Sequence, residues 1–118
     1  MSNPHKLIAI LPCTDLDISE AFYAKLGFRR AAAHENYRLL EDGHGAEIHL
    51  NSAVKEWLIR DRNPFGLYLH TDRVDELAQE LGDLVIAPPE NKPWGMYEFA
   101  LSDPDETLVR IGRPTKSN

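Results

Sequence analysis

The chain has 118 residues, of which 19 are acidic and 13 basic, so its formal net charge is −6 at pH 7. This length allows one domain with a real core but not two independent domains, and the absence of a basic stripe excludes a nucleic-acid-binding surface. No apolar run reaches the roughly 18 residues of a membrane span, the start lacks the apolar segment of a signal peptide, and the single cysteine, Cys13, excludes an internal disulfide, so we expect a cytoplasmic protein.

The first half of the chain predicts one helix among four strands. Asp17 is a candidate helix N-cap, with Glu20 in the position that completes a capping box. Gly27 ends this helix, because glycine readily adopts the left-handed conformation. The buried face of the helix is expected from apolar residues at a spacing of four: Ile18, Phe22 and Leu26. Strands are expected over 6–11, 28–33, 37–41 and 46–51, with a glycine-rich tight turn at 42–45.

The second half repeats this order. The segment 17–27 is echoed by 72–82, in which Asp72 is a candidate N-cap and Asp75 takes the box position. The apolar stripe of the second helix is Val74, Leu77 and Leu81. Strands are expected over 65–71, 84–87, 94–101 and 107–112, with a stiff proline loop at 88–93 and a turn at 103–106.

The repeat predicts an α+β fold in which two tandem βαβββ modules form curved mixed sheets, with the helices outside and a concave groove inside. We expect a single domain over 1–118 that consists of module one at 5–52, a connector at 53–64, module two at 65–112 and a frayed tail at 113–118. Open strand edges favour pairing between the copies, either within one chain or across a homodimer.

Strand alternation assigns one set of side chains to the groove, because aliphatic residues must face the helices. Alternation gives Glu47, His49, Tyr68, His70, Met96, Glu98 and Arg110 as candidate ligand-binding residues, and Tyr37 and Trp94 join them as aromatic candidates. The alternative is that these side chains only face water on the free side of an antiparallel sheet. Their aromatic content favours the groove, because aromatic rings are uncommon on a purely solvated surface.

The segments 15–28, 93–99 and 103–110 carry a resemblance to a known family. The sequence resembles the vicinal oxygen chelate superfamily, which includes glyoxalase I, extradiol dioxygenases and bleomycin-resistance proteins, over about residues 6 to 112. Glu106 stands where the family usually has glycine, which is expected to alter only the turn. The resemblance is specific for the fold and weak for the function, since one fold hosts many chemistries.

The enzymes of this family hold a divalent metal at four strand positions. By resemblance, these positions fall on Ile8, His49, Gly66 and Arg110, of which only His49 offers a metal ligand. His5 does not replace Ile8, because three residues along a strand it lies on the opposite face. We therefore expect no metal, no other cofactor and no catalytic residue.

In lacking the metal ligands, the sequence resembles the bleomycin-resistance-like members of the family. These members hold a cationic, flat-ringed glycopeptide between two subunits. The resemblance implies antibiotic resistance through non-enzymatic binding and sequestration of a bleomycin-type antibiotic in the groove of a homodimer. The ligand would be cationic or aromatic, attracted by Glu47 and Glu98 and stacked on Trp94, Tyr68 or Tyr37. Two alternatives stay open: a metal-dependent lyase, isomerase or dioxygenase that uses His49 with other partners, and a ligand-free structural or regulatory dimer.

Overall fold

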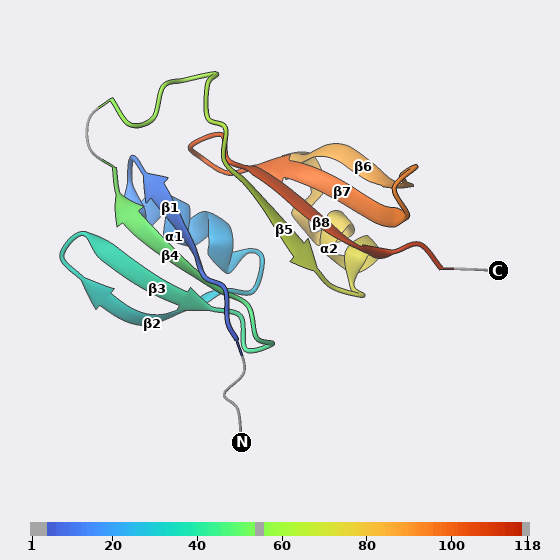
Figure 1. Cartoon of the computed structure of the whole chain (residues 1–118), viewed down its shortest axis with the longest axis horizontal. Helices are drawn as coiled ribbons and strands as arrows, with labels where there is room; N and C mark the ends of the chain where they lie inside the picture. The colour runs from blue at the N-terminus through green and yellow to red at the C-terminus, as the bar shows by residue number, and fades with distance from the viewer. Residues whose placement is uncertain (1–4, 54–55, 117–118) are drawn as a thin grey trace. The chain divides into compact units, whose positions relative to one another are not determined.

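A computed structural model describes residues 5–53 and 56–116. The chain divides into two compact units, residues 1–58 and 59–118. Each unit contains a four-stranded mixed sheet and one α-helix, so the predicted α+β fold with two βαβββ repeats is confirmed (Figure 1). No helix in the described ranges is long and apolar enough to cross a membrane.

The first unit has its strands in the order β1-β4-β3-β2. Its elements are β1 (Ala9–Cys13), α1 (Leu16–Ala24), β2 (Arg29–His34), β3 (Tyr37–Glu41) and β4 (Glu47–Ser52). Strand β1 pairs with β4 in parallel, and the other pairs are antiparallel. The prediction that the first strand ends at Leu11 is wrong, because β1 continues through Pro12. Proline is tolerated there since β1 is an edge strand of this sheet.

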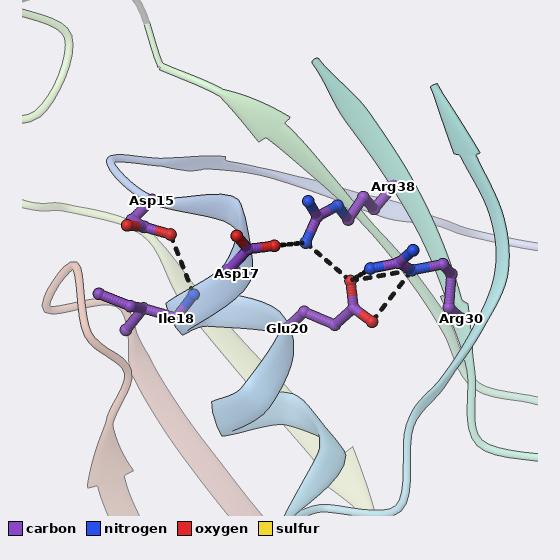
Figure 2. Close-up of polar contacts among 6 residues, drawn as sticks. All are labelled: Asp15, Asp17, Ile18, Glu20, Arg30 and Arg38. Carbon is purple, nitrogen blue, oxygen red and sulfur yellow. Dashed lines mark hydrogen bonds and ion pairs between the residues drawn. The ribbon is translucent and has the colours of Figure 1, made fainter. Parts of the chain in front are cut away.

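Helix α1 begins two residues earlier than the sequence predicts. Its N-cap is Asp15, whose Oδ1 accepts a hydrogen bond from the backbone N–H of Ile18 at 3.1 Å. Asp17 is therefore not the cap, and its carboxylate instead lies 2.7 Å from Arg38 Nη1. Glu20 forms no capping box. Its carboxylate instead accepts hydrogen bonds from Arg30 and Arg38, which lie on two neighbouring strands of the sheet (Figure 2).

The buried face of α1 also differs from the prediction. Ile18 is 56% exposed, while Phe22 and Leu26 are buried as expected. Ser19 and Tyr23 complete the buried face, since positions 19, 22, 23 and 26 follow the i, i+3, i+4, i+7 pattern of one helix face. Gly27 has φ +98°, which confirms the predicted left-handed glycine after the helix.

The second unit has its strands in the order β5-β8-β7-β6. Its elements are β5 (Gly66–His70), α2 (Val74–Leu81), a 3₁₀ turn η1 (Gly82–Leu84), β6 (Val85–Asn91), β7 (Met96–Ser102) and β8 (Leu108–Pro114). Strands β5 and β8 pair in parallel. Residues 113 and 114 lie in β8, so the prediction of a frayed tail from Arg113 onward is wrong at these two positions.

Two further predictions about the second unit are wrong. The N-cap position of α2 is Arg73, which makes no side-chain capping bond, so neither Asp72 nor Asp75 caps this helix. Pro88 and Pro89 lie within β6 and not in a loop. Strand β6 accommodates them because it is an edge strand whose register with β7 shifts between Ala87 and Glu90.

Strand alternation predicts the buried faces correctly. The helix-facing residues of β4, β7 and β8 are almost fully buried: Ile48, Leu50, Phe99, Leu101, Val109 and Ile111. The stripe of α2 is buried as well: Val74, Leu77 and Leu81. Each of these side chains contributes roughly 1.5–3 kcal/mol by leaving water. Because the apolar residues occupy one face of each sheet, the polar residues of the same strands share the opposite face.

Candidate functional site

The free face of the second sheet carries a cluster around one buried carboxylate. Glu98 lies on the central strand β7 and is only 2% exposed. Tyr68 on β5 stands directly opposite Arg110 on β8, and Trp94 lies in the turn before β7. We call Tyr68, Trp94, Glu98 and Arg110 the Glu98 cluster. Residues from two strands and one strand-preceding turn thus join Glu98 on one sheet face, and Tyr68, Glu98 and Arg110 stand at strand positions that alternation assigns to that face.

Three groups compensate the charge of Glu98. Its Oε1 accepts a hydrogen bond from Trp94 Nε1 at 2.8 Å and another from the Tyr68 hydroxyl at 3.1 Å. Its Oε2 lies 3.6 Å from Arg110 Nε. A buried carboxylate without such partners would be strongly unfavourable. The cluster therefore holds Glu98 and orients the Trp94 ring at the same time.

The turn before β7 explains how Trp94 reaches a residue four positions further on. Gly95 has φ +87°, a conformation that side-chain-bearing residues rarely adopt. The turn is closed by hydrogen bonds from Lys92 N to Met96 O at 2.7 Å and from Gly95 N to Lys92 O at 3.0 Å. The sequence predicts a strand that begins at Trp94, but β7 begins at Met96. Because Trp94 lies in the turn, its indole N–H can reach the Glu98 carboxylate.

Tyr68 stays protonated over a wide pH range. Burial first, and then the hydrogen bond to Glu98, raise the pKa of its hydroxyl to about 12. The phenol therefore acts as a donor to Glu98 and remains neutral at physiological pH.

Gly112 makes room for the Glu98 cluster. It pairs directly with Glu98 across β7 and β8. A Cβ atom at Gly112 would lie 2.3 Å from the Tyr68 hydroxyl and 2.6 Å from Glu98 Cβ. Sequence reasoning missed this residue, although a glycine inside a strand is a known signal of close approach.

A cavity of about 270 Å³ opens beside the Glu98 cluster. Its polar lining consists of Trp94, Glu98, Arg110 and Lys92, and its apolar lining comes from Ile86, Ala87, Phe99, Ala100 and Leu108. Such a mixture of apolar wall and few polar groups is typical of small-molecule sites. Lys92 was not among the predicted site residues, because no pattern in the proline-rich segment singled it out.

The first unit carries a second polar group on the free face of its own sheet. The hydroxyl of Tyr37 lies 2.7 Å from His49 Nδ1, and His49 Nε2 lies 2.6 Å from Glu47 Oε2. Lys6 forms an ion pair with Glu47 Oε1. We call Lys6, Tyr37, Glu47 and His49 the His49 network. The three predicted residues are in contact as alternation suggests, and Lys6 is an addition that sequence reasoning missed.

The His49 network is satisfied internally. The hydrogen bond from Lys6 and then that from His49 hold the pKa of Glu47 below its usual value. Both ring nitrogens of His49 have partners, since one faces Tyr37 and the other Glu47. The hydrogen bonds of the network therefore orient Lys6, Tyr37, Glu47 and His49 relative to one another on the sheet.

The residues at the family's metal positions do not fit a divalent cation. Ile8 and Gly66 offer no side-chain ligand, and Arg110 brings a positive charge. His49 already uses both of its nitrogens within its own network. In the described ranges, no group of three or more His, Cys, Asp or Glu residues could hold a metal ion.

His70 and Met96 complete the predicted set. The His70 ring packs against Tyr68 with a centroid distance of 4.7 Å and is exposed. Met96 pairs with Pro114 at the end of the sheet and is half-buried. Neither residue lines the cavity. A ligand-binding role for the nine predicted residues stays a prediction.

Comparisons with known proteins support the resemblance. The bleomycin resistance determinant encoded on the transposon Tn5 is 25% identical, with a TM-score of 0.80 over 94% of this chain and 98% of that one. A bleomycin-binding protein solved with bleomycin is 24% identical, with a TM-score of 0.77 over 93% and 98%. The antibiotic-binding protein TnmS3 from Streptomyces sp. CB03234 is 24% identical, with a TM-score of 0.75 over 98% and 99%.

No curated protein matches the chain significantly. The sequence model of one family matches residues 6–111, which is nearly the whole chain. The match, the repeated βαβββ units and the solved structures agree. The chain therefore belongs to the Glyoxalase/Bleomycin resistance protein/Dioxygenase superfamily.

Proposed function

We propose that this protein binds and sequesters a small molecule with a flat ring system, of the bleomycin type, without changing it chemically. The observation that carries the proposal is that the Trp94 side chain is both held in place and exposed. Its indole N–H is fixed on the buried Glu98 carboxylate at 2.8 Å, while the residue is 63% exposed beside the cavity.

A fixed and exposed indole suits the capture of a ring. Because the hydrogen bond to Glu98 already orders the side chain, stacking on it loses little conformational entropy. Aromatic stacking contributes about 0.5–1.5 kcal/mol beyond the area that it buries. The apolar wall formed by Ile86 and Leu108 adds surface for the rest of the ligand.

Two further observations favour capture over catalysis. The solved structure at 25% identity is a bleomycin resistance determinant, which supports an antibiotic as the ligand. Ile8, Gly66 and Arg110 offer no metal ligand at three of the family's four metal positions. These three residues therefore cannot support the metal chemistry of the family's enzymes. The proposed location is the cytoplasm, where a sequestering protein would meet an antibiotic that has entered the cell.

The binding unit is proposed to be a homodimer. Several large apolar side chains are exposed in the single chain, among them Ile10 at 56% and Ile86 at 62%. We infer that a second copy of the chain covers part of this apolar surface. Sedimentation velocity would give a dimer at micromolar protein, and a monomer at every concentration would contradict this part of the proposal.

Tryptophan emission tests the binding. Of the two tryptophans, Trp57 is removed by Trp57→Phe, so that all emission comes from Trp94. Titration with bleomycin should give a saturable change at micromolar ligand, and mass spectrometry should recover the antibiotic unchanged. Because Trp94→Ala removes the emitting indole, calorimetric titration measures the binding of this variant, which should be weaker by about 1–3 kcal/mol. A linear response without saturation, or a modified antibiotic, would contradict the proposal.

A further inference from the structure

We propose that the cavity beside Trp94 selects ligands whose flat ring carries an anionic substituent, such as a carboxylate, and that Arg110 binds this substituent. The inference rests on the proposed function, because it assigns a charge to the ligand of the same cavity. The charge preference concerns only the substituent of the ring that lies in this cavity, so a bleomycin-type ligand whose cationic groups lie outside the cavity is compatible with it. Within the cavity it reverses the sign that the sequence alone suggests, in which Glu98 attracts a cation.

Glu98 offers little to a cationic ligand. Its carboxylate is buried, its Oε1 accepts two hydrogen bonds, and its Oε2 faces Arg110. A ligand ammonium group would have to replace Arg110 or break the bonds from Tyr68 and Trp94. Because those donors would then be left unpaired in a part-buried site, the exchange is unfavourable. The negative charge is thus used within the protein.

Arg110 has the opposite character. Its side chain is 49% exposed, and its contact with Glu98 through Nε, at 3.6 Å, is longer than a hydrogen bond. Within the described ranges, its guanidinium has no other hydrogen-bond or ion-pair partner. A guanidinium presents five N–H donors in a planar fork that matches a carboxylate. Arg110 therefore has donors available where it lines the cavity.

A second cation lines the same cavity. Lys92 Nζ lies 5.9 Å from the centroid of the Trp94 ring, and its ion-pair partner Glu90 is not part of the lining. Each basic side chain has one acidic partner, Lys92 with Glu90 at 2.5 Å and Arg110 with Glu98 at 3.6 Å, so Arg110 is the less tightly paired of the two. A ligand cation placed over Trp94 would compete with Lys92 for the ring and be repelled by it. A ligand anion would meet the available donors of Arg110 and no repulsion from Lys92.

The apolar part of the cavity lining indicates what the rest of the ligand is like. Apart from the charged groups and Trp94, the walls are apolar. A flat apolar body would lie between Trp94 and the wall at Ile86 and Leu108, with its anionic group directed to Arg110. Aromatic carboxylates, and planar antibiotics that bear an acidic group, have this character.

Three matched probes test the charge preference on the unmodified protein: 2-naphthoate, 2-naphthamide and 2-naphthylmethylammonium. They share one ring system and differ in charge. The indole N–H signal of Trp94 in a heteronuclear NMR spectrum reports binding, and Trp57→Phe assigns it among the two indole signals. We expect 2-naphthoate to bind about tenfold more tightly than the amide, with the ammonium probe weakest.

Variants then locate the preference. Arg110→Gln should abolish the difference between 2-naphthoate and the amide, while Arg110→Lys should retain part of it. Arg62→Gln is the matched control, because it removes the same charge from an exposed residue outside the cavity. Loss of the preference in the Arg62 variant as well would contradict the role of Arg110. If the Arg110→Gln variant fails to fold, the ranking of the three probes on the unmodified protein still tests the preference for an anionic ligand.

The outcomes separate this inference from the proposed function. Equal affinity for the carboxylate and the amide, or tightest binding of the ammonium probe, would overturn the inference and leave ring capture at Trp94 intact. Failure of all three probes to move the Trp94 signal would contradict both.

Discussion

The hydroxyl of Tyr68 lies 2.3 Å from the point at which a Cβ atom on Gly112 would stand. That distance is shorter than any real contact between a carbon and an oxygen that are not bonded. The same Cβ would meet the backbone oxygen of Tyr97 at 2.8 Å. The side chain of Tyr68 thus occupies space that exists only because residue 112 is glycine.

The Gly112→Ala variant should be destabilised and should bind the ring ligand more weakly. The added methyl group displaces Tyr68 and Glu98, and overpacking of this kind costs about 1–3 kcal/mol. Urea denaturation measures the loss of stability, and the Trp94 emission of the Trp57→Phe background measures the release of the indole from Glu98.

Gly66→Ala is the control for this substitution. Gly66 lies on the neighbouring strand β5, and its nearest neighbour to an added Cβ is Leu108 O at 3.5 Å, an ordinary contact. The control should leave stability and emission nearly unchanged. Equal effects of the two alanines would contradict the role of Gly112.

Tyr68 should ionise at unusually high pH. Its pKa is raised to about 12 from the model-compound value of 10.0, so the protonated phenol is favoured in the folded protein. The corresponding stability is fully present below pH 10 and is lost as pH rises toward about 12. In an ultraviolet titration of tyrosinate, Tyr68→Phe should remove a step near pH 12, whereas Tyr37→Phe should retain that step. Ionisation of Tyr68 near the ordinary pKa would contradict the part-buried hydrogen bond to Glu98.

Glu20 should contribute to stability above acidic pH. Its Oε1 and Oε2 bind Arg30 Nε at 3.1 Å each, and Oε1 also binds Arg38 Nη1 at 2.9 Å, which ties α1 to β2 and β3 (Figure 2). The hydrogen bond from Arg30 is the largest cause that lowers the pKa of Glu20 below 4.5. This stabilisation is present above pH 4.5 and is lost as pH falls through the lowered pKa.

Glu20→Gln should therefore lower the free energy of unfolding by about 1 kcal/mol at neutral pH and by less under acid conditions. Glu35→Gln is the control, because Glu35 is exposed and its carboxylate forms no hydrogen bond or ion pair in the described ranges. Chemical denaturation at several pH values measures both. An effect of Glu20→Gln that does not shrink in acid would contradict the ionic origin of the contact.

The two helices should respond differently to loss of their first aspartate. Asp15→Ala removes the hydrogen bond to Ile18 N and should cost about 1 kcal/mol. Asp72→Ala should change the stability little, because α2 has no side-chain cap. Thermal unfolding of the two variants compares them. A larger effect at Asp72 would restore the assignment that the sequence suggests.

Alternation was the most reliable guide that the sequence offered. It placed Phe99, Leu101 and Val109 on the buried side, because a sheet covered on one face leaves a strand two unlike sides. By the same reasoning it put Tyr68, Glu98 and Arg110 on one face, and their contacts agree. The spacing could not reveal that Glu98 would be enclosed by its neighbours, since this depends on the missing side chain at Gly112.

The ends of the elements were harder to predict. Asp15 and Asp17 are equally good caps in isolation, and the choice depends on Arg38, which holds Asp17 from a strand far along the chain. Pro88 and Pro89 read as a loop, because a sequence does not say which strand lies at an edge. The bond from Trp94 to Glu98 depends on the turn at Gly95, which strand spacing does not describe.

The prolines of β6 also have a consequence for solubility. A proline has no amide hydrogen, so the stretch around Pro88 and Pro89 cannot serve as a template on which a foreign strand assembles. Pro12 interrupts the donors of β1 in the same way. One edge strand of each sheet is thereby protected against pairing with a foreign strand, so the apolar side chains that this acidic protein exposes need not lead to polymerisation through its backbone.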